Sequence, residues 1–478
     1  MLVISLIGKT LGPALLGEYL LVRRMASWFQ AAVALPSGVA LPRYVASSVD
    51  EPVSTRQTYF LAAMVTGCGF GLVLCAVLVV GRNVLSRPLF GSEQLAHLTF
   101  PLGVLLIGLA AHGAVFGYYQ GALAMGRASI LQVINLVAVP LLATVLLAQT
   151  HSIALIVNAM GISMIVGACC FAFPIIRKLS LHDVAQQFIK RTRELISYGF
   201  ARVSGDFGLQ ALLSLPAIIA LHYLPIGSVS FLLLGGSFLA VVAASTLPLG
   251  TILLSRVSRS IAEKRTADLQ VHLSHFVSAI VELSLFICLQ MIVFSDSIIR
   301  IWVGSRFLDG IVVVQIAILA VPFYFMYAGL RSVIDGAAIK AYNTWNIAIS
   351  AAGFLIVVAV VKMIVPQNHL LEGLAAASVI GLAALAYLSL RTLRQLFQIK
   401  PRWIGNLPGL GLAVALAVFS YCMHRWLPFQ IDLAALAIIE LFVLGVYVFL
   451  LRAIRSPWFL FFLKMLLPNF SLGENSAA

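Results

Sequence analysis

Residues 35–48 read LPSGVALPRYVASS, and residues 247–260 read LPLGTILLSRVSRS. At this offset of 212 positions, six of the fourteen pairs are identical. The same offset aligns residues 19–21 with residues 231–233, so the correspondence runs along a whole helix and not only around the shared proline. Chance agreement among Leu, Pro and Gly is one explanation. We favour the other, an internal repeat that relates two halves of the chain.

Both copies lie within long apolar segments. The 478-residue chain is 61% hydrophobic and only 10% charged, and its mean hydropathy is +1.04. A soluble protein of this size cannot bury so much apolar surface, whereas a lipid bilayer accepts it. Segments such as 311–326 and 410–421 are apolar on all faces and lack the two-residue alternation of a membrane β-barrel. The sequence therefore predicts an all-α polytopic membrane protein.

Apolar runs of about 20 residues, enough to cross a hydrocarbon core roughly 30 Å thick, recur along the whole chain. They predict about fourteen transmembrane helices, of which the first is truncated. The predicted spans are 1–10, 18–44, 59–80, 95–118, 129–149, 153–176, 198–223, 227–255, 271–295, 310–334, 344–364, 370–390, 405–423 and 431–451.

An even number of predicted spans separates the two copies of the repeat, so both copies cross the membrane in the same direction. This predicts two parallel six-helix lobes plus two additional C-terminal helices. A cavity between two such bundles, opened to each side in turn, is the physical basis of alternating access. The predicted divisions are 1–176 for the N-terminal lobe, 177–197 for a cytoplasmic amphipathic linker, 198–390 for the C-terminal lobe, 391–404 for a cytoplasmic loop, 405–451 for the two additional transmembrane helices and 452–478 for a cytoplasmic tail.

The net charge of +14 does not predict a nucleic-acid partner, because the distribution of the basic residues indicates membrane topology instead. The basic residues lie in short loops between apolar runs and form no continuous stripe. With the N-terminus inside, 20 Lys and Arg residues fall on the cytoplasmic side and 7 on the other side. The positive-inside rule therefore predicts that both termini are cytoplasmic.

Motifs for nucleotide hydrolysis and common hydrolytic chemistry are missing from the sequence. It contains no GxxxxGK[ST] loop, no HExxH motif and no GxSxG motif. The six cysteines show no CxxC spacing and predict no metal site. We therefore expect a protein that is not an enzyme and has no cofactor, and whose transport is driven by a gradient or by substrate concentration.

Three segments carry a resemblance to a known family. They are LGPALLGEY at residues 11–19, PSGVALPR at residues 36–43 and QGALAMGR at residues 120–127. In these segments, and in span order over roughly the first 390 residues, the chain resembles the MOP exporter superfamily, specifically the polysaccharide or O-antigen flippases that are related to the MATE exporters. The sequence departs from the family pattern at its start, where most of the first helix is missing.

This resemblance implies two lobes of helices that carry a lipid-linked oligosaccharide, attached to undecaprenyl pyrophosphate, across the membrane. It implies a multi-pass protein of the bacterial inner (plasma) membrane that serves polysaccharide or lipopolysaccharide biosynthesis. The implied partners are the lipid-linked oligosaccharide, membrane lipid and, in such a pathway, the polysaccharide polymerase and the chain-length components.

Charged residues within the predicted spans are the candidate site residues, because a charge at the bilayer centre costs about 2.5 to 3.5 kcal/mol. A pyrophosphate needs cations that replace water around its oxygens, and the guanidinium fork suits this role. The substrate-binding candidates in a cationic cavity are Arg23, Arg24, Arg202 and Arg331. A structural alternative stays open for each: the first two extend to the outer interface, and the last two pair with Asp206 and Asp335, four residues further along the same helix.

Four acidic residues are candidates for coupling to an ion, because burial favours the protonated form of a carboxyl group. They are Asp206, Glu282, Asp335 and Glu440. For Glu282 the alternative is pairing with a basic group on a neighbouring helix. Glu440 lies in the additional pair of helices, outside the repeat.

Prolines and one histidine within the spans add further expectations. A proline removes a backbone hydrogen bond and bends the helix, so Pro36, Pro42 and Pro248 are predicted hinge or bend positions, with static shaping as the alternative. A lone histidine such as His112 is predicted to hydrogen-bond to a neighbouring helix.

The sequence leaves three functions to compare. The first is the flippase. The second is a cation-coupled multidrug exporter of the MATE type, which needs acidic rather than basic cavity walls. The third is a membrane-embedded polysaccharide polymerase, which a large periplasmic loop would favour, whereas the predicted outer loops have about fifteen residues or fewer. The four arginines within predicted spans favour the flippase.

Overall fold

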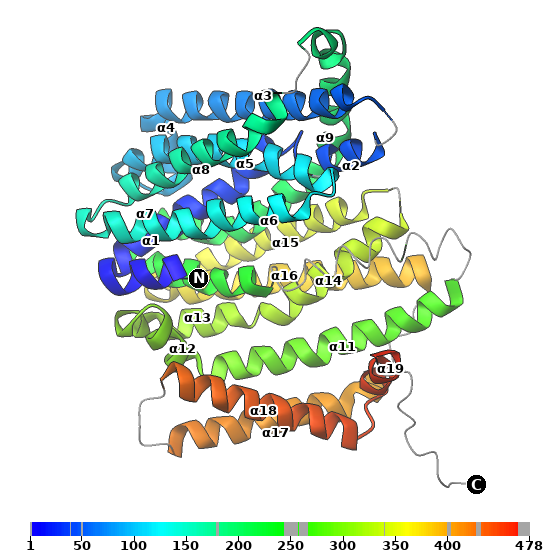
Figure 1. Cartoon of the computed structure of the whole chain (residues 1–478). Helices are drawn as coiled ribbons and strands as arrows, with labels where there is room; N and C mark the ends of the chain where they lie inside the picture. Colours follow the sequence, from blue (N-terminus) through cyan, green and yellow to red (C-terminus); the bar gives the residue numbers. More distant parts are fainter. Residues whose placement is uncertain are drawn as a thin grey trace. The chain divides into compact units, whose positions relative to one another are not determined.

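The computed structural model describes residues 2–38, 40–48, 51–177, 181–242, 257, 266–338, 340–398, 403–426 and 432–466 of the chain. All regular secondary structure in these ranges is helical (Figure 1). The predicted all-α class is therefore confirmed. The second copy of the repeat, residues 247–260 with Pro248, lies outside the described residues except for Val257.

The helices follow one another along the chain with short connections. They are α1 (Leu2–Val33), α2 (Ala40–Ser47), α3 (Val53–Val80), α4 (Arg82–Phe90), η1 (Glu93–Leu98), α5 (Thr99–Gly121), α6 (Met125–Val133), the π-helical η2 (Ile134–Ala138), α7 (Val139–Leu147), η3 (Ala148–Thr150), α8 (Ile153–Ile176), α9 (Leu181–Leu221), a helix at Ile226–Val242, α11 (Thr266–Val293), α12 (Ser295–Trp302), η4 (Ser305–Gly310), α13 (Ile311–Ile318), α14 (Val321–Ala337), α15 (Tyr342–Ile364), η5 (Gln367–His369), α16 (Leu370–Phe397), α17 (Trp403–Trp426), α18 (Leu433–Ala453) and α19 (Pro457–Leu466).

Within the described residues, ten helices are long and apolar enough to cross a membrane. An eleventh span results if Ser305–Ile318 and Val321–Ala337, which meet at a 43° bend, cross together. Much of their apolar surface faces outward: Val73 of α3 is 61% exposed and Val80 is 87% exposed. Such exposure is expected where lipid is the solvent. The polytopic membrane class is confirmed, whereas the count of fourteen spans is not.

The N-terminal helix differs from the predicted spans at 1–10 and 18–44. α1 extends from Leu2 to Val33 and contains one break at Gly12, just before Pro13. The φ angle of Gly12 is 82°. The chain then leaves the helix in a turn over residues 34–38. The prediction of one span over 18–44 is therefore wrong. Pro36 ends the helix because it removes a helical hydrogen bond and disfavours the helical backbone conformation of the residue before it.

Three glycines of α5 explain where this turn and α2 pack. Gly113, Gly117 and Gly121 recur every four residues and so share one helix face. A Cβ atom at Gly117 would lie 2.8 Å from the carbonyl oxygen of Ser37, and one at Gly121 would lie 2.6 Å from that of Pro42. Only glycine lets the two backbones approach this closely.

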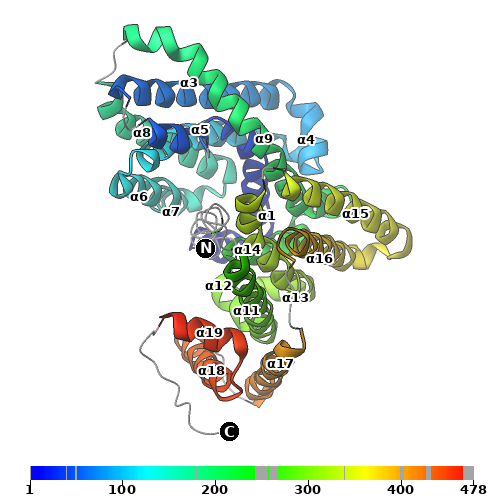
Figure 2. The same cartoon turned by 90° about the vertical axis from the view of Figure 1, so that its right-hand side faces the viewer.

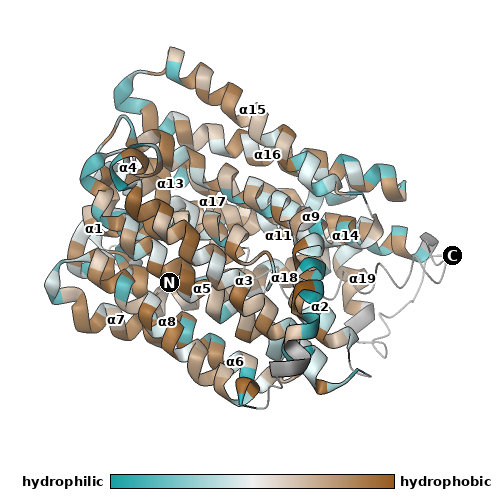
Figure 3. Ribbon diagram, turned by 90° about the horizontal axis from the view of Figure 1, so that it is seen from above, coloured by the Kyte–Doolittle hydropathy of each residue, from teal (hydrophilic) through white to brown (hydrophobic). Residues whose placement is uncertain are grey.

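Residues 181–197 of the predicted linker 177–197 are part of a longer helix. α9 is continuous over 41 residues from Leu181 to Leu221. Its second part, Val203–Leu221, is apolar enough to cross the membrane, and its first part is polar. In Figure 3 the teal of hydrophilic residues marks this first part near α2, whereas brown predominates along the long helices. The amphipathic character was predicted, but the continuity with the following span was not.

The contacts divide the chain into two compact units, each with its own core. Unit 1 comprises Met1–Leu234, Trp302–Phe307 and Val358–Leu374, and unit 2 comprises the remaining residues from Gly235 onward. In unit 1, α5 packs between α3 and α8, and the three lie together in Figures 1 and 2. In unit 2, α11 packs against α14, α17 and α19. The predicted lobe boundaries stay predictions.

Candidate functional site

The two predicted cations of α1 lie on its more exposed side. Arg23 is exposed and Arg24 is half-buried, while their neighbours Val22 and Met25 are completely buried. The Arg23 side chain lies close enough to Tyr19, one helical turn earlier, for the two to interact electrostatically. Arg24 also has an interaction partner among the described residues. Both guanidinium groups therefore lie at the boundary between protein and surroundings.

Arg331 and Asp335 form the same-helix ion pair that the sequence allows as an alternative. Arg331 Nε lies 3.9 Å from Asp335 Oδ2, and both side chains are partly exposed. Asn343 of α15 donates through Nδ2 to Asp335 Oδ1 at 2.8 Å and to the carbonyl oxygen of Arg331 at 3.0 Å. The pair therefore joins the C-terminal end of α14 to the start of α15. Whether it also binds substrate stays a prediction.

The other predicted pair is described only in part. Arg202 lies in α9, and its side chain is outside the described residues. Asp206, one turn further along α9, is half-buried and has an interaction partner. Their predicted roles are untested by this geometry.

Glu282 is the most deeply buried of the predicted carboxylates. It lies on α11 with a relative exposure of 0%, and no basic side chain pairs with it in the described part of the chain. The Trp458 indole of α19 approaches this carboxylate, yet neither the Glu282 oxygens nor Trp458 Nε1 completes a well-formed hydrogen bond there. A Cβ atom at Gly409 of α17 would collide with Glu282 Oε2. The carboxylate thus fills space left by a glycine.

Apolar side chains surround Glu282 within unit 2. Tyr447 of α18 donates through Oη to the backbone carbonyl of Glu282 at 3.4 Å. The buried cluster of this region consists of Ala279, Phe286, Ala413, Leu416, Val443, Tyr447, Leu451 and Trp458. The proton-coupling role of Glu282 stays a prediction. Glu440, the other predicted carboxylate of this region, is half-buried on α18.

The predicted bend positions have different local structures. Pro36 lies in the turn between α1 and α2, and Pro42 lies within the short helix α2. Pro36 therefore separates two helices and does not bend one continuous span. Pro248 lies outside the described residues.

His112 forms the predicted contact with a neighbouring helix. Asn135, in the π-helical turn η2, donates through Nδ2 to His112 Nδ1 at 3.2 Å and to the carbonyl oxygen of Met164 at 3.3 Å. This assignment places the histidine proton on Nε2. Asn135 is completely buried, and a Cβ atom at Gly167 of α8 would collide with its Oδ1. The prediction for His112 is confirmed.

A polar network that the sequence did not indicate joins α9 to α3. Tyr59 donates through Oη to Glu194 Oε2 at 2.5 Å. Arg191 donates to Tyr59 Oη at 2.7 Å, to Glu194 Oε2 at 3.3 Å and to Glu51 Oε2 at 3.2 Å. Its guanidinium carbon also lies 4.8 Å from the centre of the Tyr59 ring. Residues 51 and 59 are more than 130 positions away from 191 in the chain, so only the fold brings them together.

The network stabilises the ionised form of Glu194, which lies outside the membrane-spanning part of α9. Burial alone would raise the pKa of this carboxyl group. The hydrogen bonds from Tyr59 and Arg191, with the positive charges of Arg191 and Lys190, outweigh burial and hold the pKa below its ordinary value of 4.5. Glu194 is therefore ionised at neutral pH.

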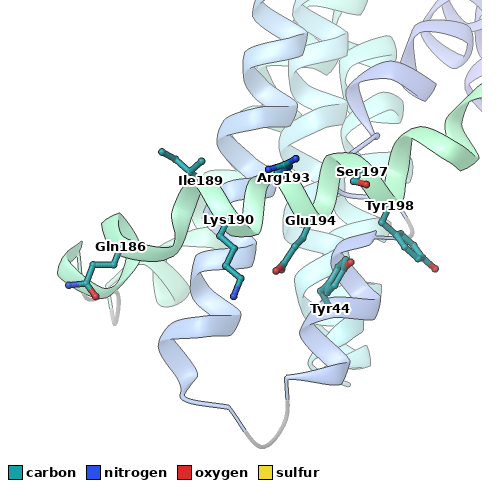
Figure 4. Close-up of a pocket in the computed structure, with 8 residues that line it drawn as sticks. All are labelled: Tyr44, Gln186, Ile189, Lys190, Arg193, Glu194, Ser197 and Tyr198. Carbon is teal, nitrogen blue, oxygen red and sulfur yellow. The ribbon is translucent and has the colours of Figure 1, made fainter.

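A pocket of about 930 Å³ lies beside this network, on the first part of α9 (Figure 4). Its lining residues are Tyr44, Gln186, Ile189, Lys190, Arg193, Glu194, Ser197 and Tyr198. In Figure 4 the Glu194 and Lys190 side chains extend to the same side of α9, toward the helices behind it, and Tyr44 comes from α2. The pocket offers two cations, several hydroxyl groups and aromatic rings. Among the described residues, no group of three or more His, Cys, Asp or Glu side chains has the arrangement of a metal site.

The chain matches no protein-family model, and no curated protein sequence matches it. Its fold does resemble solved structures. The lipid II flippase MurJ in an inward closed conformation aligns over 98% of this chain and 96% of its own length, with a TM-score of 0.72 and 16% sequence identity.

Two transporters give further structural matches. An inward-facing multidrug resistance MATE family transporter of the MOP superfamily aligns over 83% of this chain and 93% of its own, with a TM-score of 0.65 and 14% identity. The eukaryotic MATE transporter AtDTX14 has the same coverages and identity, with a TM-score of 0.54. This polytopic chain therefore has the fold that the MurJ flippase shares with the MATE transporters.

Proposed function

We propose that this protein transports a lipid-linked oligosaccharide across the bacterial inner membrane. The substrate is a sugar unit on undecaprenyl pyrophosphate, used for polysaccharide or lipopolysaccharide biosynthesis. The observation that carries the proposal is the extent of the structural likeness. The lipid II flippase matches 98% of this chain, whereas the two MATE transporters each match 83%.

The residues proposed to act on this substrate follow from charge chemistry. Arg23, Arg24, Arg202 and Arg331 are the proposed cations for the pyrophosphate. Guanidinium groups suit phosphate oxygens because each presents several donors in one plane. The partial exposure of Arg23, Arg24 and Arg331 supports this role, since a ligand can reach their side chains.

Glu282 is our proposed proton-coupling residue. Its complete burial in an apolar cluster and its lack of a basic partner among the described residues support proton binding. Asp206, Asp335 and Glu440 are secondary candidates. Asp335 is the weakest of them, because Arg331 and Asn343 already contact its carboxylate oxygens.

A MATE-type multidrug exporter is the second candidate function, and the fold likeness to two MATE transporters favours it. One experiment distinguishes the flippase from the exporter. The gene is deleted in its host, and the strain is complemented with wild-type protein or an empty vector. The flippase proposal expects lost surface polysaccharide and accumulation of lipid-linked sugar, with unchanged drug susceptibility. Increased drug susceptibility with normal surface polysaccharide would support the exporter and contradict the flippase.

A further inference from the structure

The pocket on α9 adjoins an apolar groove on the same helix. This groove has a volume of about 380 Å³ and is lined by Phe188, Ile189, Thr192, Arg193, Ile196 and Ser197. Ile189, Arg193 and Ser197 line both cavities. A pocket that carries charged and hydroxyl side chains therefore adjoins an apolar groove, which is the division that a phospholipid has between its headgroup and its chains.

Charge in the pocket favours an anion. Lys190 and Arg193 are exposed, and Arg193 makes no hydrogen bond or ion pair within the described part of the chain. Glu194 also lines the pocket, but Tyr59 and Arg191 already hydrogen-bond to its carboxylate. Lysine and arginine near a membrane surface attract anionic headgroups.

Neighbouring groups add donors that suit a phosphodiester. Arg43 of α2 donates to Tyr198 Oη and lies 4.7 Å above the Tyr198 ring. Ser197 and Tyr44 bring further hydroxyl groups to the pocket wall. Serine, tyrosine, lysine and arginine side chains all bind phosphate oxygens.

The pocket lies beside the ends of two apolar segments, where the headgroup layer of a bilayer, roughly 5 to 7 Å thick on each side, is expected. Arg191 contacts Glu51, just before α3, and Tyr59, where the predicted apolar run of α3 begins. Tyr198 lies five residues before Val203, where the apolar part of α9 starts, or about 8 Å along the helix. Tyrosines are enriched at this level of the membrane. These positions at the ends of two apolar segments support a location of the pocket at the membrane interface.

An ordinary solvated helix face is the simpler explanation for Lys190 and Arg193. It does not account for the groove beside them, where the Ile189 side chain is 82% exposed. Transfer of an isoleucine side chain from water to lipid chains lowers its free energy.

From this juxtaposition of cationic pocket, apolar groove and interfacial depth we infer that α9 binds an anionic glycerophospholipid, with its phosphodiester in the pocket and the start of its acyl chains in the groove. This lipid site is separate from the transported substrate, and the inference does not depend on the proposed function.

The test uses the purified full-length protein in detergent, titrated with phosphatidylglycerol or phosphatidylcholine and analysed by native mass spectrometry. Wild-type protein is expected to bind phosphatidylglycerol about tenfold more tightly than phosphatidylcholine. The double variant K190A/R193A is expected to lose this preference. The matched control R82A/R87A removes the same charge from exposed positions of α4, beyond the other end of α3, and is expected to keep it.

Two further arms identify the source of the phosphate. I189S is expected to weaken the binding of both lipids without changing their ratio, because it removes apolar surface that the pocket and the groove share and leaves the charge unchanged. Millimolar inorganic phosphate is expected to leave bound phosphatidylglycerol in place. Retention of the full preference by K190A/R193A would overturn the lipid site. Displacement by inorganic phosphate, with no effect of I189S, would also overturn it and would assign the pocket to a soluble anion.

Discussion

Tyr59 of α3 donates a 2.5 Å hydrogen bond to the carboxylate of Glu194 on α9. Arg191 reaches the same two side chains, so one hydroxyl, one carboxylate and one guanidinium join the two helices. Charge-assisted hydrogen bonds of this kind are stronger than neutral ones. The contact fixes the polar part of α9 against the start of α3, and the pocket is built on that surface.

Removal of the Tyr59 hydroxyl should loosen this junction. We expect Tyr59→Phe to lower the free energy of unfolding by about 1 kcal/mol, because the ionised Glu194 loses one donor but keeps Arg191. The measurement is the melting temperature in detergent. Tyr118→Phe is the matched control, since the Tyr118 hydroxyl makes no hydrogen bond within the described residues. Equal melting temperatures for the two variants would contradict a stabilising role of the network.

Acid should weaken the same junction through Glu194. Its pKa is lowered in the folded protein, so its contribution to stability is complete above its ordinary value of 4.5 and is lost as the pH falls through the lower folded value. We expect the melting temperature of wild-type protein to fall below about pH 4.5, and Glu194→Gln to reduce this fall. Glu93→Gln, at an exposed position of η1, should retain the wild-type profile. A Glu194→Gln profile parallel to wild type would refute the assignment.

Gly409 should be intolerant of alanine because of Glu282. A Cβ atom there would collide with the Glu282 carboxylate, so we expect Gly409→Ala to destabilise the protein by about 1 to 3 kcal/mol. Gly411, two residues further along α17, has no atom within 4 Å of an added Cβ and serves as the control.

A double variant tests whether Glu282 is the group with which the added Cβ atom at position 409 collides. Removing the carboxylate by Glu282→Ala should recover part of the stability lost in Gly409→Ala, so the two changes should be non-additive. Additive losses in the double variant, measured by thermal unfolding in detergent, would show that the collision is with another group.

The glycine face of α5 gives an independent test of the N-terminal packing. Gly117→Ala would place a Cβ atom 2.8 Å from a backbone oxygen of the turn that contains Pro36, and backbone cannot move aside as a side chain can. We expect a loss of about 1 to 3 kcal/mol in stability. Gly69→Ala in α3, where an added Cβ meets nothing within 4 Å, should be neutral or slightly stabilising. Similar unfolding temperatures for both variants would contradict the close packing of the turn on α5.

The arginines of α1 give a prediction about transport. If Arg23 and Arg24 bind the pyrophosphate, the double variant R23Q/R24Q should lower transport by at least roughly tenfold, because each hydrogen bond to a charged group contributes about 1.5 to 3 kcal/mol. Arg82→Gln, outside the proposed site, should leave the rate unchanged. Normal transport by R23Q/R24Q would remove these residues from the substrate site.

Composition and apolar run length were sufficient to predict the helical membrane class, because lipid imposes long apolar helices wherever a chain crosses it. Most predicted spans correspond to a helix within a few residues, as for 59–80 and α3, or 153–176 and α8. The end of the span at 18–44 was predicted wrongly. Apolarity continues past Pro36, and only the packing of the turn on the α5 glycines shows where the helix stops.

The polar contacts between helices could be predicted from the sequence less well than the spans. The Arg331–Asp335 pair follows from a four-residue spacing on one helix, so it was among the alternatives. The Tyr59–Glu194 contact joins residues 135 positions apart and has no local pattern. The pocket on α9 was missed for the same reason, because Tyr44 reaches it from a different helix.

The central claim is that this chain moves a lipid-linked oligosaccharide between leaflets. The most direct measurement reconstitutes the purified protein in liposomes that carry an undecaprenyl-pyrophosphate-linked oligosaccharide, and follows how fast the inner-leaflet sugar becomes accessible to a membrane-impermeant glycosidase. We expect wild-type protein to expose this sugar faster than protein-free liposomes do, and R23Q/R24Q to slow its exposure. Exposure at the protein-free rate, by protein confirmed to be folded and inserted, would contradict the claim.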